Sequence, residues 1–339
     1  MSFIPPKPNY PLNEGAVQLM LSEHKDSTVR QYQLTWSKFL GCLAKEGIAH
    51  EGIVLSTVYN FLSAELAESD WAYSTIAGYR CALVHPLLYA LGLDIEGKHR
   101  VSFMSGLFQT KPPPRTTRFP LWSISDVLYY LVKGPCEPLE EATWPLLTMK
   151  VFFLVMLASG RRISEVANIS REHVSRQDTI FLSWLPDFRA KHASVDFGPE
   201  DPSISRMNSL DKIELKLCPV RAWEIYRRRR SRVVNHFNND CFWAASQDTL
   251  SEYFVSLVKK ALVFSGHSVN VKICVHQMRK LAGSLSKKFF NIIDKDLCAK
   301  MGSKSMVVLN KAYIRDVSPL KFTCVVPAGT LKASSNLSV

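Results

Sequence analysis

The sequence predicts a mainly α-helical chain of two domains, with a small β-sheet in the second domain. Apolar residues recur at helical spacing through most of the chain, and a proline-rich basic stretch interrupts them once, near residue 111. A short segment beyond that stretch, residues 179–184, has the composition of a β-strand. Hydrophobic residues make up 47% of the 339 residues, which is enough to form a sizeable core in each domain.

Residues 1–23 are expected to form an irregular N-terminal arm, because four prolines fall within its first half. The apolar spacing then predicts a bundle of four or five helices over residues 24–110. The first of these helices starts after the N-capping residues 26–28 and is closed by Gly47. Further apolar patterns in this domain cover residues 54–66, 76–91 and 101–108.

Residues 111–118, Lys-Pro-Pro-Pro-Arg-Thr-Thr-Arg, predict a linker between the two domains. Three consecutive prolines cannot continue a helix, and the residues around them are polar or basic. A surface loop within a single domain is the alternative. The second domain is expected over residues 119–317, and a C-terminal tail over residues 318–339.

The second domain is predicted to be helical apart from one β-hairpin. Residues 179–184 are the expected strand, and residues 187–194 are the expected turn of the hairpin. Another strand-like stretch, residues 322–326, lies in the tail. The predicted helices cover residues 124–132, 143–158, 161–169, 219–234, 250–264, 275–289, 294–301 and 305–313.

The charge of the chain points to a polyanionic partner, and nucleic acid is the commonest one. The net charge is +12, but residues 1–110 contain eight Lys and Arg against ten Asp and Glu, a net of −2, so the rest carries +14. In the basic cluster of residues 226–232, we expect Arg227, Arg228 and Arg230 to contact DNA phosphates. A solvated helix face is the alternative.

In the nearly neutral N-terminal domain, Arg30, Lys38 and Arg80 are the cations expected to share a DNA-facing surface. No run of residues approaches the roughly 18 apolar residues that span a bilayer, and no apolar segment follows the N-terminus as in a secretory signal. The eight cysteines form no Cys-x-x-Cys pair, which argues against a zinc site and favours free thiols in a reducing, intracellular compartment.

Residues 157–165, Leu-Ala-Ser-Gly-Arg-Arg-Ile-Ser-Glu, predict a guanidinium group at the start of a helix. Gly160 lets the backbone turn sharply before the two arginines. Glu165 follows Arg162 by three residues and therefore lies on the same helical face, where its carboxylate can hold the arginine. An exposed surface ion pair is the commoner meaning of this pattern when it stands alone.

His276 and Arg279 are spaced to share one face of a helix. Arginine binds phosphate oxygens with two hydrogen bonds, and histidine donates a hydrogen bond or transfers a proton. The two side chains can therefore converge on one anionic group, although a surface histidine and arginine on a basic helix is the alternative.

Residues 302–313 place a tyrosine at the end of a short predicted helix. Gly302 precedes this helix, and Ser303 and Lys304 follow the glycine with groups that can donate to a phosphate oxygen. Tyr313 would present its phenol as a nucleophile or, as is more common, pack it into the core.

The order and spacing of these segments resemble those of the tyrosine recombinase (phage integrase) family. Residues 160–165 look like the family's Gly-x-Arg-x-Ser-Glu box, residues 276–279 match its His-x-x-Arg box, and Tyr313 falls where the family keeps its nucleophile. Residues 24–110 look like the family's helical, SAM-like core-binding domain, and residues 119–317 like its catalytic domain. Three short segments, residues 186–191, 217–222 and 304–306, are similar to recombinases of eukaryotic mobile elements, the DIRS-like and Crypton groups.

This resemblance implies a mechanism. Arg162 and Arg279 would hold the scissile phosphate while Tyr313 attacks it and forms a 3′-phosphotyrosyl bond. His276 would assist proton transfer, and Glu165 would orient the site. The resemblance also implies a lysine in a β-hairpin turn that protonates the leaving 5′-oxygen. Lys191 fits that place best, and Lys212 and Lys216 are weaker rivals.

The resemblance further implies double-stranded DNA as the partner and a dimer to tetramer of this chain on the DNA. It implies no cofactor and no metal ion, because the guanidinium groups take the electrostatic role of a metal. The nucleus is the expected location for a eukaryotic mobile element, and the cytoplasm otherwise.

One residue departs from the family's pattern. The family usually has His or Trp directly after the glycine that precedes the tyrosine helix, whereas Gly302 is followed here by Ser303. This departure favours one alternative, a DNA-binding protein that keeps the fold and has impaired catalysis. A second alternative is a type IB topoisomerase, which shares the chemistry but relaxes supercoils.

Overall fold

The computed structural model describes residues 26–49, 52–69, 71–113, 122–188, 202–207, 211–231, 240–290, 297–298 and 301. The chain divides into two compact units, Met1–Thr116 and Thr117–Val339, and this division falls within the proline-rich segment 111–118. The predicted arm, the tail and the helix over residues 305–313 lie outside the described residues. The described part is mainly helical with one small sheet, so the predicted fold class is confirmed.

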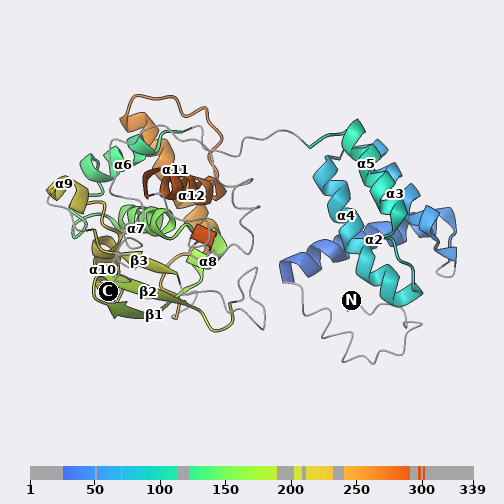
Figure 1. Ribbon diagram of the computed structural model, residues 1–339, viewed down its shortest axis with the longest axis horizontal. Coiled ribbons are helices and arrows are strands. Elements are labelled where there is room, and N and C mark those ends of the chain that lie inside the picture. Colours follow the sequence, from blue (N-terminus) through green and yellow to red (C-terminus); the bar gives the residue numbers. More distant parts are fainter. Residues whose placement is uncertain are drawn as a thin grey trace, which may run out of the picture. The chain divides into compact units, whose positions relative to one another are not determined.

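The first unit has four described helices, and α4 contacts the other three. Figure 1 labels them, and they lie where the apolar spacing predicted helices. Gly47 ends the first helix with a φ of 66°, in the left-handed region that favours glycine. The core includes Trp36, Phe39, Phe61 and Leu83. The four helices are α2 (Asp26–Glu46), α3 (Leu55–Ser69), α4 (Tyr73–Leu91) and α5 (Lys98–Thr110).

The second unit is built around α7 (Trp144–Ser159), whose residues from Leu147 to Ser159 are all buried. A helix that is apolar on all sides belongs in a core, and α7 packs against α8, α10, α11, α12 and β3. The other described helices of this unit are α6 (Ile124–Lys133), α8 (Ile163–Ala167), α9 (Lys212–Leu215), α10 (Pro219–Arg230), α11 (Gln247–Phe264) and α12 (His276–Phe290).

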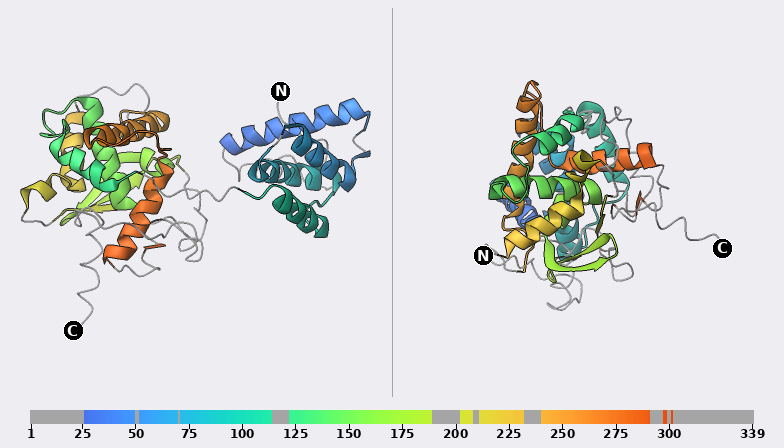
Figure 2. Two further views of the ribbon diagram at one scale, coloured as in Figure 1. Left: turned by 90° about the horizontal axis from the view of Figure 1, so that it is seen from above. Right: turned by 90° about the vertical axis from the view of Figure 1, so that its left-hand side faces the viewer.

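The sheet has three antiparallel strands in the order β1 (Ile169–Arg176), β2 (Thr179–Trp184) and β3 (Ser203–Ser205). It lies along one edge of the unit, with the helices gathered over one side of it (Figures 1 and 2). In the described register, Arg176 pairs with Thr179, and Ile180 pairs with Ile204.

The strand β1 corrects the sequence prediction. A helix was expected over residues 161–169, but only Ile163–Ala167 is helical and Ile169 already begins β1. Beyond Ile169 and Ser170 this strand is not buried, so it carries no alternating apolar pattern that would reveal it. The hairpin between β1 and β2 turns at Gln177, whose φ is 51°. Most of the predicted turn, from residue 189 onward, lies outside the described residues.

A buried charge cluster ties the loop before α7 to α10. The Lys150 ammonium, with 0% of its side chain exposed, donates to Glu137 Oε1 at 2.5 Å and to the Leu131 carbonyl at 2.7 Å. The Arg221 guanidinium donates to both oxygens of Glu137, at 3.0 and 3.2 Å. Burial raises the pKa of Glu137, but the two cations outweigh burial and hold that pKa below its ordinary value.

The cysteines that the structure describes are all free thiols. In the same part of the chain, no helix has both the length and the apolar character needed to cross a bilayer.

Candidate active site

Arg162 stands at the corner between α7 and α8, directly before the first residue of α8. Its guanidinium donates to Glu165 Oε1 at 2.7 Å, and its backbone N–H donates to Glu165 Oε2 at 3.3 Å. Glu165 is almost fully buried, whereas the Arg162 side chain is 18% exposed. The predicted contact is therefore present, and one buried carboxylate fixes both the arginine and the start of the helix.

The preceding arginine has a different environment. Arg161 is 2% exposed, and its guanidinium lies over the Trp184 ring, 5.6 Å from the ring centroid. The pair of adjacent arginines thus divides between a buried residue that packs on the sheet and a partly exposed one at the corner. Of the two, only Arg162 presents its side chain where an anion can approach.

Gly160 is the meeting point of three segments that are far apart in the sequence. It ends α7 with a φ of 62°, as the predicted sharp turn requires. Its carbonyl accepts a hydrogen bond from Arg279 Nη1 at 3.2 Å, on α12. A Cβ atom at this position would lie 3.1 Å from Cγ of Met301 and 3.6 Å from Cβ of Ala282. Met301 directly precedes Gly302, so the residue just before the predicted tyrosine segment packs against this corner.

The two residues of the His-x-x-Arg segment differ in exposure. His276 is the first residue of α12 and is exposed, and its Nδ1 lies 3.7 Å from Cys274 Sγ. Arg279 is only 3% exposed and faces the Gly160 carbonyl, two residues from Arg162. The structure thus brings Arg162, Glu165 and Arg279 to one corner, with His276 one helical turn from Arg279.

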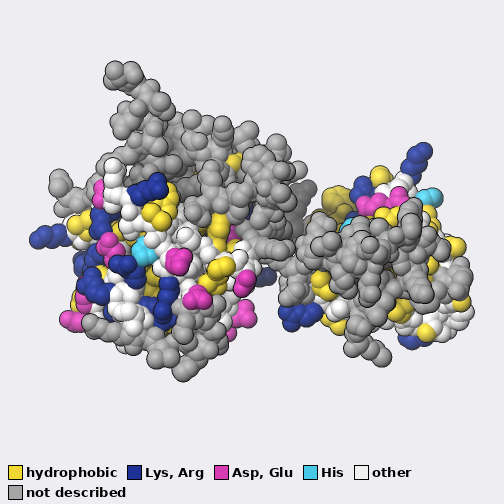
Figure 3. Space-filling view, turned by 90° about the horizontal axis from the view of Figure 1, so that it is seen from below, with side chains coloured by type: hydrophobic (Ala, Val, Ile, Leu, Met, Phe, Trp, Pro, Cys, Tyr) yellow, Lys and Arg dark blue, Asp and Glu magenta, His cyan; other side chains and the backbone are white. Residues whose placement is uncertain are grey.

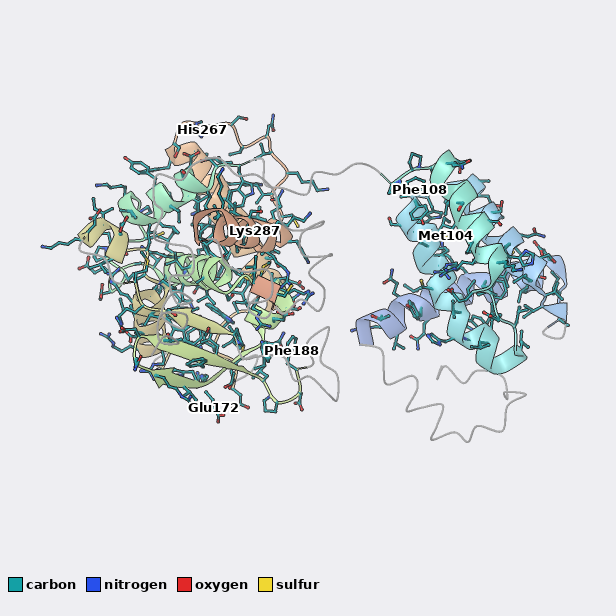
Figure 4. All side chains as sticks on the ribbon, in the orientation of Figure 1. Met104, Phe108, Glu172, Phe188, His267 and Lys287 are labelled. Carbon is teal, nitrogen blue, oxygen red and sulfur yellow. The ribbon has the colours of Figure 1, made fainter. Side chains whose placement is uncertain are left out.

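The remaining predicted catalytic and supporting residues, Lys191, Ser303, Lys304 and Tyr313, lie outside the described residues. Lys191 belongs to the connection between β2 and β3, and it is the only lysine between these strands. Figure 4 labels Phe188, where the described part of that connection ends. The rivals Lys212 and Lys216 lie at the two ends of α9 instead.

The predicted DNA contacts on α10 need one correction. Arg227 and Arg228 are exposed, but Arg230 is 2% exposed and is not a surface residue. It follows Tyr226, which is also buried, by one helical turn, so both lie on the packed face of the helix. Seen from the side of β1, this unit shows Lys and Arg side chains gathered with acidic ones among them (Figure 3).

In the first unit, two of the three predicted contacts are engaged within the unit. Lys38 donates to the Tyr79 hydroxyl at 3.0 Å and lies 3.6 Å from Glu65, and the Tyr79 hydrogen bond raises the pKa of Lys38. Arg80 forms an ion pair with Glu96. Arg30 is exposed.

One group that the sequence did not single out is central to the second unit. The side-chain amide of Gln277, within the His-x-x-Arg segment, accepts from Trp122 Nε1 at 3.0 Å and from the Cys274 N–H at 2.9 Å. The only sequence signal that could have identified Gln277 is its position between His276 and Arg279.

No protein-family model matches the sequence, and no curated protein does. Solved structures with a similar fold include the Tn1549 transposon integrase in complex with transposon right end DNA (TM-score 0.57, 14% identity, 89% of this chain and 94% of that chain). They also include the XerH site-specific recombinase bound to palindromic difH substrate (TM-score 0.52, 16% identity, 83% of this chain and 74% of that chain). A third is a lambda integrase dimer bound to a COC′ core site (TM-score 0.51, 15% identity, 90% of this chain and 78% of that chain). The chain therefore has the fold of the tyrosine recombinases.

Proposed function

We propose that this chain is a site-specific DNA recombinase or integrase that cuts and rejoins double-stranded DNA through a 3′-phosphotyrosyl intermediate. The observation that carries the proposal is the corner at Gly160. There Arg279 donates to the carbonyl of Gly160, two residues before Arg162, and Met301, which precedes the segment that leads to Tyr313, packs against the same glycine.

In the proposed reaction, the Tyr313 oxygen attacks the scissile phosphorus and displaces the 5′-oxygen. Arg162 and Arg279 hold the nonbridging oxygens and stabilise the charge of the transition state. Lys191 gives its proton to the leaving 5′-oxygen, and His276 assists proton transfer to or from the phosphate. The new phosphotyrosyl ester conserves the energy of the broken ester, so a 5′-hydroxyl can reverse the step and rejoin DNA without ATP.

Supporting groups complete the proposed site. Glu165 orients Arg162 through their ion pair. Ser303 and Lys304 follow Gly302 and donate to the phosphate in the place where the resembled family has His or Trp. The reaction needs no cofactor and no metal ion, because the two guanidinium groups supply the positive charge.

The finer parts of the proposal concern context. The similarity in fold to a transposon integrase and the resemblance of residues 186–191 and 217–222 to DIRS-like and Crypton recombinases support a role in a mobile element. For a eukaryotic element the protein would act in the nucleus. A dimer to tetramer on DNA is proposed because one of the similar structures is a dimer bound to its core site.

Affinity for DNA is proposed to come from exposed cations outside the corner. Arg227 and Arg228 on α10 and Arg30 on α2 are exposed and suited to phosphate contacts. Arg279 is nearly closed off from solvent, so the proposal requires this side chain to become accessible when DNA binds.

A trapping experiment tests the proposal. The purified chain is incubated with DNA duplexes that have the sequence of the ends of the element that carries its gene. Each duplex is nicked, so that cleavage releases a short fragment that carries the 5′-hydroxyl. This fragment diffuses away and cannot rejoin the strand. The expected result is a covalent protein–DNA adduct, which Tyr313→Phe abolishes. A matched control, Tyr129→Phe, changes an exposed tyrosine on α6 and leaves adduct formation intact.

The other outcomes are informative. Specific binding without any adduct would reject the enzyme and leave a DNA-binding protein of the same fold, as the departure at Ser303 would suggest. Relaxation of supercoiled plasmids without a specific site would instead favour a type IB topoisomerase.

A further inference from the structure

A chain of hydrogen bonds leads from Trp122 to His276, and its first bond is buried. It begins at Trp122, near the start of α6. The Trp122 side chain is 4% exposed, and its Nε1 donates to Gln277 Oε1 at 3.0 Å. The two residues are 155 positions apart, so this contact ties the first helix of the unit to α12. The Trp122 ring also packs edge-on against Phe254, with centroids 5.9 Å apart.

Gln277 uses both the oxygen and the nitrogen of its side-chain amide. Besides the bond from Trp122, its Oε1 accepts the Cys274 N–H at 2.9 Å, and its Nε2 donates to the Lys272 carbonyl at 3.2 Å. The Gln277 side chain is therefore hydrogen-bonded to both ends of residues 272–274, the segment that leads into α12. Gln277 is 7% exposed, and a buried amide that is satisfied in this way fixes its surroundings.

The segment that Gln277 holds reaches His276 directly. Cys274 Sγ lies 3.7 Å from Nδ1 of His276, the first residue of α12. When Nδ1 is engaged by the thiol, Nε2 is the ring nitrogen left for a phosphate oxygen or a transferred proton. His276 is itself exposed, and among the described residues the Cys274 thiol is a hydrogen-bond partner of its ring.

We infer that Gln277, held by Trp122, is a positioning residue that sets the orientation of the His276 imidazole through residues 272–274. This inference deepens the proposed function and rests on it for its catalytic consequence. Its structural part, the control of the His276 ring, is independent of any reaction.

Two variants weaken the connection between Gln277 and His276 to different degrees, and a third is a control. Trp122→Phe removes only the indole N–H and keeps a ring against Phe254. Gln277→Met keeps the length of the side chain and removes all three hydrogen bonds. Tyr226→Phe is the matched control, because on α10 it removes a hydrogen bond that a buried side chain accepts, from the Ala244 N–H at 3.2 Å.

The first readout needs no activity. With histidines labelled at the imidazole, nuclear magnetic resonance follows the ring signals through a pH titration, and His276→Asn identifies the His276 signal. We expect the ring chemical shifts of His276 to change in Trp122→Phe, to change more in Gln277→Met, and to stay as in wild type in Tyr226→Phe. An unchanged His276 signal in Gln277→Met would overturn the inference.

The second readout is the rate of covalent adduct formation at saturating DNA. Because a displacement of a reacting group by about 1 Å costs up to a hundredfold, we expect a loss of about tenfold in Gln277→Met and a smaller loss in Trp122→Phe. DNA affinity should be unchanged. The double variant should match Gln277→Met alone, because both changes break the same connection.

The two failures can be told apart. If wild type forms no adduct on any duplex, the proposed function fails, while the ring chemical shifts of His276 still decide its positioning. If wild type forms the adduct and both variants form it at the wild-type rate, the positioning role is wrong and the proposed function stands. Losses that multiply in the double variant would also contradict a shared connection.

Discussion

Substitution of Gly160 by alanine tests how tightly the corner is packed. The φ of 62° costs an alanine about 1–2 kcal/mol, because its Cβ crowds the backbone in this region. The added Cβ would also lie 3.1 Å from Cγ of Met301, a side chain that is 1% exposed and has to shift within packed surroundings. Forcing extra atoms into a filled core costs about 1–3 kcal/mol. Gly160→Ala should therefore destabilise the second unit by about 2–5 kcal/mol.

A second glycine separates the cost of the backbone conformation from the cost of packing the added Cβ. Gly266 has a φ of 75°, but a Cβ there meets nothing within 4 Å. Figure 4 labels its neighbour His267, which lies at the edge of the unit apart from α8. Gly266→Ala should therefore show the backbone cost alone, about 1–2 kcal/mol.

Urea unfolding of wild type and both variants measures the difference. We expect Gly160→Ala to be less stable than Gly266→Ala, and Met301→Ala to recover part of this gap when combined with Gly160→Ala, because it removes the atoms that the Cβ meets. Equal destabilisation by the two glycine variants, or strictly additive effects of Gly160→Ala and Met301→Ala, would refute the packing of Met301 against this corner.

Three further substitutions test other contacts. Glu165→Gln should lower stability by about 1–3 kcal/mol, because it removes the charged partner of Arg162, and a thermal melt that matches wild type would contradict this. Glu137→Gln should be less stable than wild type at neutral pH, and the gap should narrow in melts taken at progressively lower pH. The Glu137 carboxylate has a lowered folded pKa, so its contribution is full above the ordinary value of 4.5 and is lost as the pH falls through the folded value. Replacing Arg227 and Arg228 together by serine should weaken DNA binding and reduce the slope of log affinity against log salt by about 2, whereas an unchanged slope would exclude phosphate contacts by this pair.

The helices were predictable from local patterns, and β1 was not. In α2, α4 and α11 the apolar residues recur every three or four positions because one face packs on the core, and the sequence carries that period. In β1 only Ile169 and Ser170 are buried, so the strand is held mainly by its pairing with β2. Such pairing depends on a neighbouring strand and leaves little trace in the residues of β1 itself.

The contacts of the candidate site also differ in whether local sequence spacing could predict them. The contact between Arg162 and Glu165 spans three residues, so helical spacing was enough to predict it. The contact between Arg279 and Gly160 spans 119 residues, and only the packing of α12 on α7 creates it. The burial of Arg230 and Arg279 was also unpredictable, since arginine is ordinarily exposed and composition gives no sign of the exceptions.

The separation between the corner and the exposed arginines has a consequence for the proposed reaction. Arg162 is held by a buried carboxylate and Arg279 by a backbone carbonyl, so neither depends on freely moving counterions for its position. Arg227 and Arg228 are exposed, and any phosphate contact they make releases counterions and weakens as salt rises. Salt should therefore govern how much DNA is bound, while the rate of adduct formation on bound DNA should stay nearly constant. Affinity would then reside on α10 and at Arg30 of α2, and chemistry where α7, α8 and α12 meet.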